Sequence, residues 1–76
     1  MRIEILGTGC GRCQQLTQNV RAALQHLGSG AEVHKIEDIQ KIMAYGVMST
    51  PALVVDGKVQ FAGRVPTPRE LEAYFR

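Results

Sequence analysis

Cys10 and Cys13 are the two cysteines of this 76-residue sequence, and Gly11 and Arg12 separate them. Two thiols at this spacing can form a stabilising disulfide, bind a soft metal ion or exchange electrons with another disulfide. A disulfide that closes so short a loop would contribute only about 2 kcal/mol on chain-entropy grounds, and a reducing compartment would remove it. The spacing therefore favours redox chemistry or metal binding over a structural cross-link.

The two sulfurs are expected to have different surroundings. A helix is predicted to begin at the cysteine pair, because apolar residues recur at helical spacing after Cys13, at Leu16, Val20, Leu24 and Leu27. Cys13 shares this apolar face and should be buried. Cys10 falls at the helix N-terminus, where unpaired N–H groups and the helix dipole favour a thiolate, and the charge of Arg12 adds to this effect.

This difference predicts a mechanism of thiol–disulfide exchange. Cys10 attacks the disulfide of a partner protein and forms a mixed disulfide, which Cys13 then resolves. The partner leaves reduced, and the Cys10–Cys13 pair is left oxidised. The redox-active disulfide is thus the electron carrier, and we expect no other cofactor and no bound metal.

The elements that position this pair follow from the apolar pattern. Strands are predicted at Ile3–Leu6, Glu32–Ile36, Ala52–Val55 and Val59–Ala62. Asp38 and Thr67 can each cap a further helix, and Asp56-Gly57 is typical of a hairpin turn. The order is βαβαββα, which predicts one α/β domain over residues 1–76, with a mixed four-stranded sheet and helices on both faces.

The same pattern predicts the burial of particular side chains. The short second helix should carry Ile39, Ile42 and Met43 inward, and Met48 should also fill the core. The terminal helix should bury the side chains of Leu71, Tyr74 and Phe75. Three polar side chains are expected simply to be solvated, namely His26, His34 and Arg64.

Composition excludes several classes of partner. Hydrophobic residues make up 45% of the chain and charged residues 21%, as in ordinary globular proteins, and the net charge of +2 comes from charges scattered along the sequence. A nucleic-acid partner is therefore not expected. The sequence has no apolar run of about 20 residues and no signal-peptide pattern, so we expect no membrane association. A cytoplasmic monomer is the expected form.

With these features together, the chain resembles the thioredoxin-like superfamily, and above all its small redox-active disulfide proteins, or mini-thioredoxins. The likeness covers nearly the whole chain and depends on the Cys10–Cys13 motif, the Thr50-Pro51 pair and the Asp56-Gly57 hairpin. The resemblance implies a cis proline at Pro51 beside the cysteines. It also implies that the backbone of Thr50 binds an extended segment of the substrate by strand addition.

The chain departs from the best-known members of that superfamily around the motif. Gly9 stands where thioredoxin has tryptophan, and Arg12 where it has proline, so the redox potential is not fixed by the resemblance. The segment after the last strand lacks the Gly-Gly and acidic pattern of glutaredoxins, so an electron donor like thioredoxin reductase is expected rather than glutathione. Ungapped counting places Glu4 at the buried acid of thioredoxin, as a candidate proton acceptor.

Two other classes of function compete with this one. Small copper carriers also place two cysteines at this spacing at a helix start, and soft thiolates suit Cu(I) and Zn. Those carriers have the element order βαββαβ and a Met two residues before the first cysteine, where this chain has Thr8. A non-catalytic docking module is the third class, and the retained cysteine pair is evidence against it.

Overall fold

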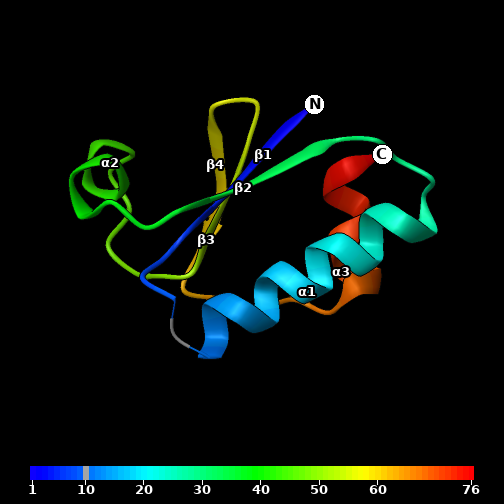
Figure 1. Cartoon of the computed structure of the whole chain (residues 1–76), viewed down its shortest axis with the longest axis horizontal. Helices are drawn as coiled ribbons and strands as arrows, with labels where there is room; N and C mark the ends of the chain where they lie inside the picture. Colours follow the sequence, from blue (N-terminus) through cyan, green and yellow to red (C-terminus); the bar gives the residue numbers. More distant parts are fainter. Residues whose placement is uncertain (10) are drawn as a thin grey trace.

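The computed structural model describes residues 1–9 and 11–76, which form seven elements in the predicted order βαβαββα (Figure 1). In chain order these are β1 (Arg2–Leu6), α1 (Gly11–His26), β2 (Glu32–Ile36), α2 (Ile39–Ala44), β3 (Ala52–Val55), β4 (Lys58–Ala62) and α3 (Pro68–Phe75). The predicted fold class is confirmed. Within the described residues, no helix is both long and apolar enough to cross a membrane.

The strands form one mixed sheet in the order β2-β1-β3-β4. Strand β1 lies in the middle, parallel to β2 and antiparallel to β3, and β3 pairs antiparallel with β4. Because α1 connects two parallel neighbours, it must cross over one face of the sheet. The end of β1 and the start of α1, which carries Cys13, therefore lie at one edge of the molecule (Figure 1).

Two apolar clusters hold helices to the two faces of the sheet. The larger core includes Ile3 and Ile5 of β1 and joins the sheet to α1 and α3. The smaller core consists of Leu6, Ile42, Ala52 and Val54 and joins the sheet to α2. Since successive side chains of a strand point to opposite faces, Ile3 and Ile5 face α1, whereas Glu4 and Leu6 face α2. Figure 1 shows α1 and α3 together on one side of the sheet and α2 away from them.

Helix α1 follows the predicted stripe. Leu16 and Val20 have no exposed surface, and Leu24 is 5% exposed. Its end is a Schellman motif, in which Ser29 N–H donates to Leu24 O at 2.9 Å and Gly28 N–H to Gln25 O at 3.1 Å. Gly28 has a φ of +66°, which glycine adopts without steric cost.

The β3–β4 hairpin also follows the sequence. Asp56 and Gly57 both have positive φ, as a two-residue type I′ turn requires. The turn is tied to the first strand, because Asp56 N–H donates to Arg2 O at 2.8 Å and Arg2 N–H donates to Asp56 Oδ1 at 2.8 Å. These bonds connect the hairpin tip to the middle of the sheet.

Three of the predictions of burial are wrong. Ile39, Met43 and Met48 are 60%, 68% and 97% exposed. Asp38 does cap α2, accepting from Gln40 N–H at 2.9 Å, but this helix has only six residues. A helix of that length turns fewer than two times, and a single residue, Ile42, reaches the smaller core.

Helix α3 begins with a complete capping box. Glu70 N–H donates to Thr67 Oγ1, and Thr67 N–H donates in return to Glu70 Oε1 at 3.1 Å. The backbone bond from Thr67, with the hydroxyl bond second, lowers the pKa of Glu70 below its ordinary value. Leu71 and Phe75 then pack into the larger core.

We predict that Thr67→Ala lowers the stability by about 1 kcal/mol at neutral pH, the usual loss of an N-cap. In a domain of this size the melting temperature should then fall by roughly 4–8 °C. Thermal unfolding followed by circular dichroism checks this, and an unchanged melting temperature would show that the box contributes nothing.

Glu70→Gln is the matched variant for the pH dependence. A carboxyl whose pKa is lowered in the folded state stabilises the fold above its unfolded pKa, and this stabilisation is lost as the pH falls through the folded pKa. The wild type should therefore lose stability on acidification through this range. The Gln variant should lose less over the same range.

Candidate active site

The candidate site lies where β1 ends and α1 begins. Cys10, predicted to be the attacking thiolate, lies outside the described residues. Cys13 is in the first turn of α1 and is 2% exposed, so its predicted burial is confirmed. Its carbonyl accepts a hydrogen bond at 2.9 Å from the hydroxyl of Thr17, which is itself buried. The second cysteine is therefore held in the interior by the helix that carries it.

Gly7 packs closely against the side chain of Cys13. A Cβ atom at Gly7 would lie 3.2 Å from the Cys13 Cβ and would collide with its Sγ. The same Cβ would lie 3.9 Å from the Cβ of Thr50, so Gly7 stands between Cys13 and Thr50. Local sequence pattern does not reveal this packing role of Gly7. Its position directly after a buried strand was the available signal.

Thr50 and Pro51 form the opposite side of the site. Their peptide bond is cis, the isomer that the family resemblance implies. Pro51 is buried, Thr50 is half-buried, and strand β3 begins at the next residue. The Pro51 carbonyl accepts from Gly63 N–H at 2.8 Å. The structure thus brings Thr50 and Pro51 to the same end of the sheet as Cys13.

Arg12 has a defined partner in the structure. Its Nη2 donates to the carbonyl oxygen of Gly63 at 2.8 Å, although the two residues are 51 positions apart. Its predicted effect on the Cys10 thiol stays a prediction. Gly11, also predicted to tune the pair, is exposed at the first position of α1, and a Cβ there would meet no atom within 4 Å.

Glu4 lies on the other side of the sheet from α1. It is 8% exposed, its Oε1 accepts a hydrogen bond from the Tyr45 hydroxyl at 2.6 Å, and Arg2 Nε lies 3.9 Å away. The hydrogen bond to this carboxylate, followed by burial and its negative charge, raises the pKa of Tyr45. The role of Glu4 as a proton acceptor stays a prediction, and its contacts here are with Tyr45 and Arg2.

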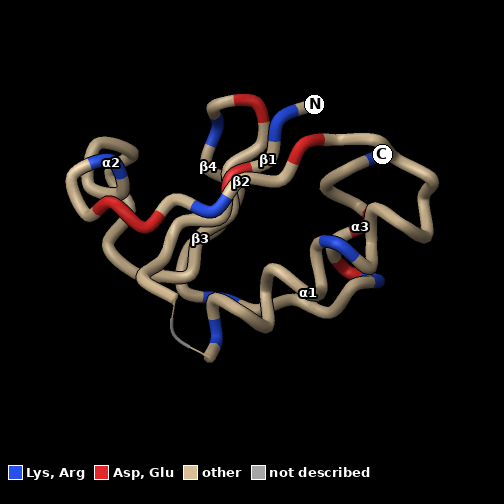
Figure 2. Tube along the Cα trace, viewed as in Figure 1, with Lys and Arg blue, Asp and Glu red and all other residues tan. Residues whose placement is uncertain are grey.

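Figure 2 shows the charged residues spread along the chain rather than gathered in one segment. Of the three polar side chains predicted to be solvated, His26 and Arg64 are exposed and His34 is half-buried, and each also contacts another side chain. His26 Nδ1 lies 3.0 Å from Glu72 Oε1, His34 Nε2 lies 3.2 Å from both Arg2 and Glu32, and the Arg64 guanidinium lies 5.5 Å from the ring centre of Phe61. Sequence spacing could not show the contacts of His26 with Glu72 and of His34 with Arg2, because each of these joins residues of different elements.

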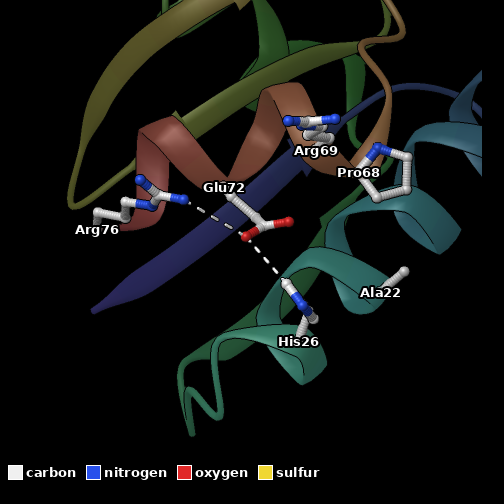
Figure 3. A pocket seen from close by; sticks show the side chains of 6 residues that line it. All are labelled: Ala22, His26, Pro68, Arg69, Glu72 and Arg76. Carbon is white, nitrogen blue, oxygen red and sulfur yellow. Dashed lines mark hydrogen bonds and ion pairs between the residues drawn. The ribbon is translucent and has the colours of Figure 1, made fainter.

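Helices α1 and α3 also border an open pocket of about 580 Å³. Figure 3 shows the side chains of His26 and Arg76 directed at Glu72, with Pro68 and Arg69 alongside. The pocket lies at the end of α1 far from Cys13. In residues 1–9 and 11–76, no three His, Cys, Asp or Glu side chains are grouped closely enough to hold a metal ion.

Comparison with known proteins gives one family throughout. Residues 1–76 match the thioredoxin domain family. A thioredoxin of Methanothermobacter thermautotrophicus is 42% identical over 72 residues, covering 95% of this chain and 94% of its own. A thioredoxin of Methanocaldococcus jannaschii is 37% identical over 70 residues, covering 92% of this chain and 80% of its own.

Gly7→Ala should destabilise the protein by about 1–3 kcal/mol, the usual effect of adding a methyl group to a packed interior. The reason is steric, because the new Cβ displaces the sulfur of Cys13. Urea unfolding checks this. Gly30→Ala is the control, since a Cβ there meets no atom within 4 Å, and its stability should be unchanged or slightly higher. Equal stability of the two variants would refute the packing role of Gly7.

The raised pKa of Tyr45 predicts a phenol that ionises above the ordinary value near pH 10. Ultraviolet titration should show this late ionisation in the wild type and not in Tyr45→Phe. The variant should also lose about 1 kcal/mol at pH 7 with the hydrogen bond to Glu4. A group with a raised pKa stabilises the fold below its unfolded pKa and ceases to do so as the pH rises through the folded value. The difference from wild type should therefore shrink in alkali. Tyr74→Phe, the control, should keep the late ionisation.

Proposed function

The chain belongs to the thioredoxin domain family, and from this we propose that it is a thiol–disulfide oxidoreductase that uses Cys10 and Cys13 to reduce disulfides of other proteins. The observation that carries the proposal is the packing of Cys13 against Gly7, next to Thr50 and the cis Pro51. A buried thiol at that position suits a resolving cysteine, because it is sheltered from every disulfide except one already bound at the site.

The sequence position of Cys10 supports its role as the nucleophile. It directly precedes α1, which begins at Gly11. The unpaired N–H groups and the dipole at the start of this helix favour a negative charge. No acidic residue in the first turn already supplies one. A thiolate attacks disulfides and a thiol does not, so a lowered pKa at Cys10 promotes the reaction near neutral pH.

The reaction proceeds in two balanced exchanges. The Cys10 thiolate attacks one sulfur of the substrate disulfide, the substrate S–S bond breaks, and the leaving thiolate takes up a proton. Cys13 then loses its proton and attacks the Cys10 sulfur of the mixed disulfide, which releases the second substrate thiolate. Two electrons pass to the substrate, and Cys10–Cys13 becomes the oxidised pair.

The partners follow from this chemistry. The substrate is a protein with an accessible disulfide in an extended segment, and the backbone of Thr50 pairs with such a segment by strand addition. Turnover requires a dithiol donor, and we assign this role to a thioredoxin-reductase-like protein rather than glutathione. The redox-active disulfide is the protein's own electron carrier, with no other cofactor or metal. The protein works as a cytoplasmic monomer, away from membranes and nucleic acid.

Cys13→Ser should trap a covalent complex with a disulfide substrate, because the mixed disulfide at Cys10 can no longer be resolved. Incubation of the reduced variant with insulin, followed by a non-reducing gel, checks this. Cys10→Ser is the matched control and should trap none, because Cys13 is 2% exposed. Equal trapping by both variants would contradict the assignment of roles.

The same preparations separate the alternative of a soft-metal carrier. The reduced wild type is incubated with Cu(I) or Zn, desalted and assayed for metal, while insulin reduction is measured in parallel with dithiothreitol as the donor. An oxidoreductase reduces insulin in the absence of metal. Stoichiometric metal retention without insulin reduction would favour the carrier.

A further inference from the structure

The segment between β4 and α3 is held against α1 at two points. Arg12 Nη2 donates to Gly63 O at 2.8 Å, and Asn19 Nδ2 donates to Pro66 O at 2.9 Å. The two donors are seven residues apart, or about two helical turns, so they lie on the same side of α1. Both bonds join a helix side chain to a backbone carbonyl. They differ in position, because Arg12 lies inside the cysteine motif and Asn19 lies beyond it.

Gly63 is hydrogen-bonded both to Arg12 and to Pro51. Its carbonyl accepts from Arg12, and its N–H donates to Pro51 O at 2.8 Å. Gly63 has a φ of +76°, and a Cβ there would lie only 3.0 Å from the Ser49 Cβ. Its peptide groups are therefore fixed between the helix and the residues next to Thr50. The result is a chain of two hydrogen bonds, from Arg12 through Gly63 to Pro51.

We propose that Arg12 is a positioning residue that sets the distance and orientation between the cysteine motif and the Thr50-Pro51 segment through Gly63. The inference rests on the proposed function, in which a substrate segment pairs with Thr50 while its disulfide reaches the cysteines. A bound segment presents its sulfur correctly only when these two parts of the site keep a fixed relation. Arg12 thus affects the reduction of extended protein substrates by keeping the Thr50-Pro51 segment in a fixed relation to the cysteine motif.

This role differs from the electrostatic effect on the Cys10 thiol that the sequence alone suggests. A charge near the thiolate would change its pKa, and with it the rate toward every disulfide, large or small. A positioning bond changes the rate only for substrates that use the Thr50 backbone. The two roles are therefore separated by comparing an extended substrate with a small one.

The test compares Arg12→Met with wild type in single-turnover reduction of insulin and of the small aromatic disulfide DTNB. Arg12→Met keeps an unbranched apolar stem and loses both charge and hydrogen bond. We expect its rate constant with insulin to fall about fivefold, within the usual range for loss of one intramolecular hydrogen bond, and its rate with DTNB to stay within about twofold. The pH midpoint of Cys10 alkylation should not move. Arg12→Lys, which keeps the charge and one donor group, should recover part of the insulin rate.

Asn19→Leu is the matched control, because it removes the other bond that holds the same segment to α1. It should lower the stability but leave the ratio of insulin rate to DTNB rate unchanged. Hydrogen exchange of the Gly63 amide gives a readout independent of activity. It should be faster in Arg12→Met and unchanged in Asn19→Leu.

Three results would overturn the inference. These are an unchanged insulin rate in Arg12→Met, an equal loss toward both substrates with a shifted alkylation midpoint, or unchanged exchange of the Gly63 amide. A wild type that reduces neither substrate would instead refute the proposed function. The amide exchange would still decide whether Arg12 fixes Gly63.

Discussion

The close approach of the Gly7 backbone to the Cys13 side chain is the constraint on which the rest of the site depends. It requires a residue without a Cβ at the point where the central strand leaves the sheet. It also requires α1 to start close enough to that strand to bury Cys13, whereas Gly11, Arg12 and Gln14 of the same turn are exposed. Because interiors are packed as densely as organic crystals, such a contact restricts how the helix can lie relative to the sheet. Thr50 lies against the same glycine, so both halves of the site take their position from it.

The two faces of the sheet carry different groups of side chains. The face toward α1 and α3 carries most of the apolar core and therefore most of the stabilisation from burial. The face toward α2 carries a small core and, beside it, the buried Glu4 carboxylate with its bond from Tyr45. A carboxylate this well buried needs a partner, because an unpaired buried charge is strongly unfavourable. Most of the apolar packing is therefore on the face of the sheet covered by α1, the helix that carries Cys13.

Hydrogen bonds to loop peptide groups connect segments that are far apart in the sequence. The segment after β4 is tied to α1 and to Pro51, at the end of the sheet where Cys13 lies. The hairpin tip is tied to Arg2 at the opposite end. Each bond satisfies a peptide group that a loop would otherwise leave to solvent. Together they hold both ends of a small domain whose core is limited.

The sequence by itself determined the order of elements, the burial of Cys13 and the hairpin, because helical periodicity, cap residues and the Asp56-Gly57 turn are local signals. Tertiary structure alone decided which loops meet. The partner of Arg12 is 51 residues away, and the tight fit of Gly7 depends on a helix that packs back onto its own strand. It also decided that Ile39 and Met43 stay outside, because the burial of a side chain depends on which surface its helix meets as well as on its own hydrophobicity.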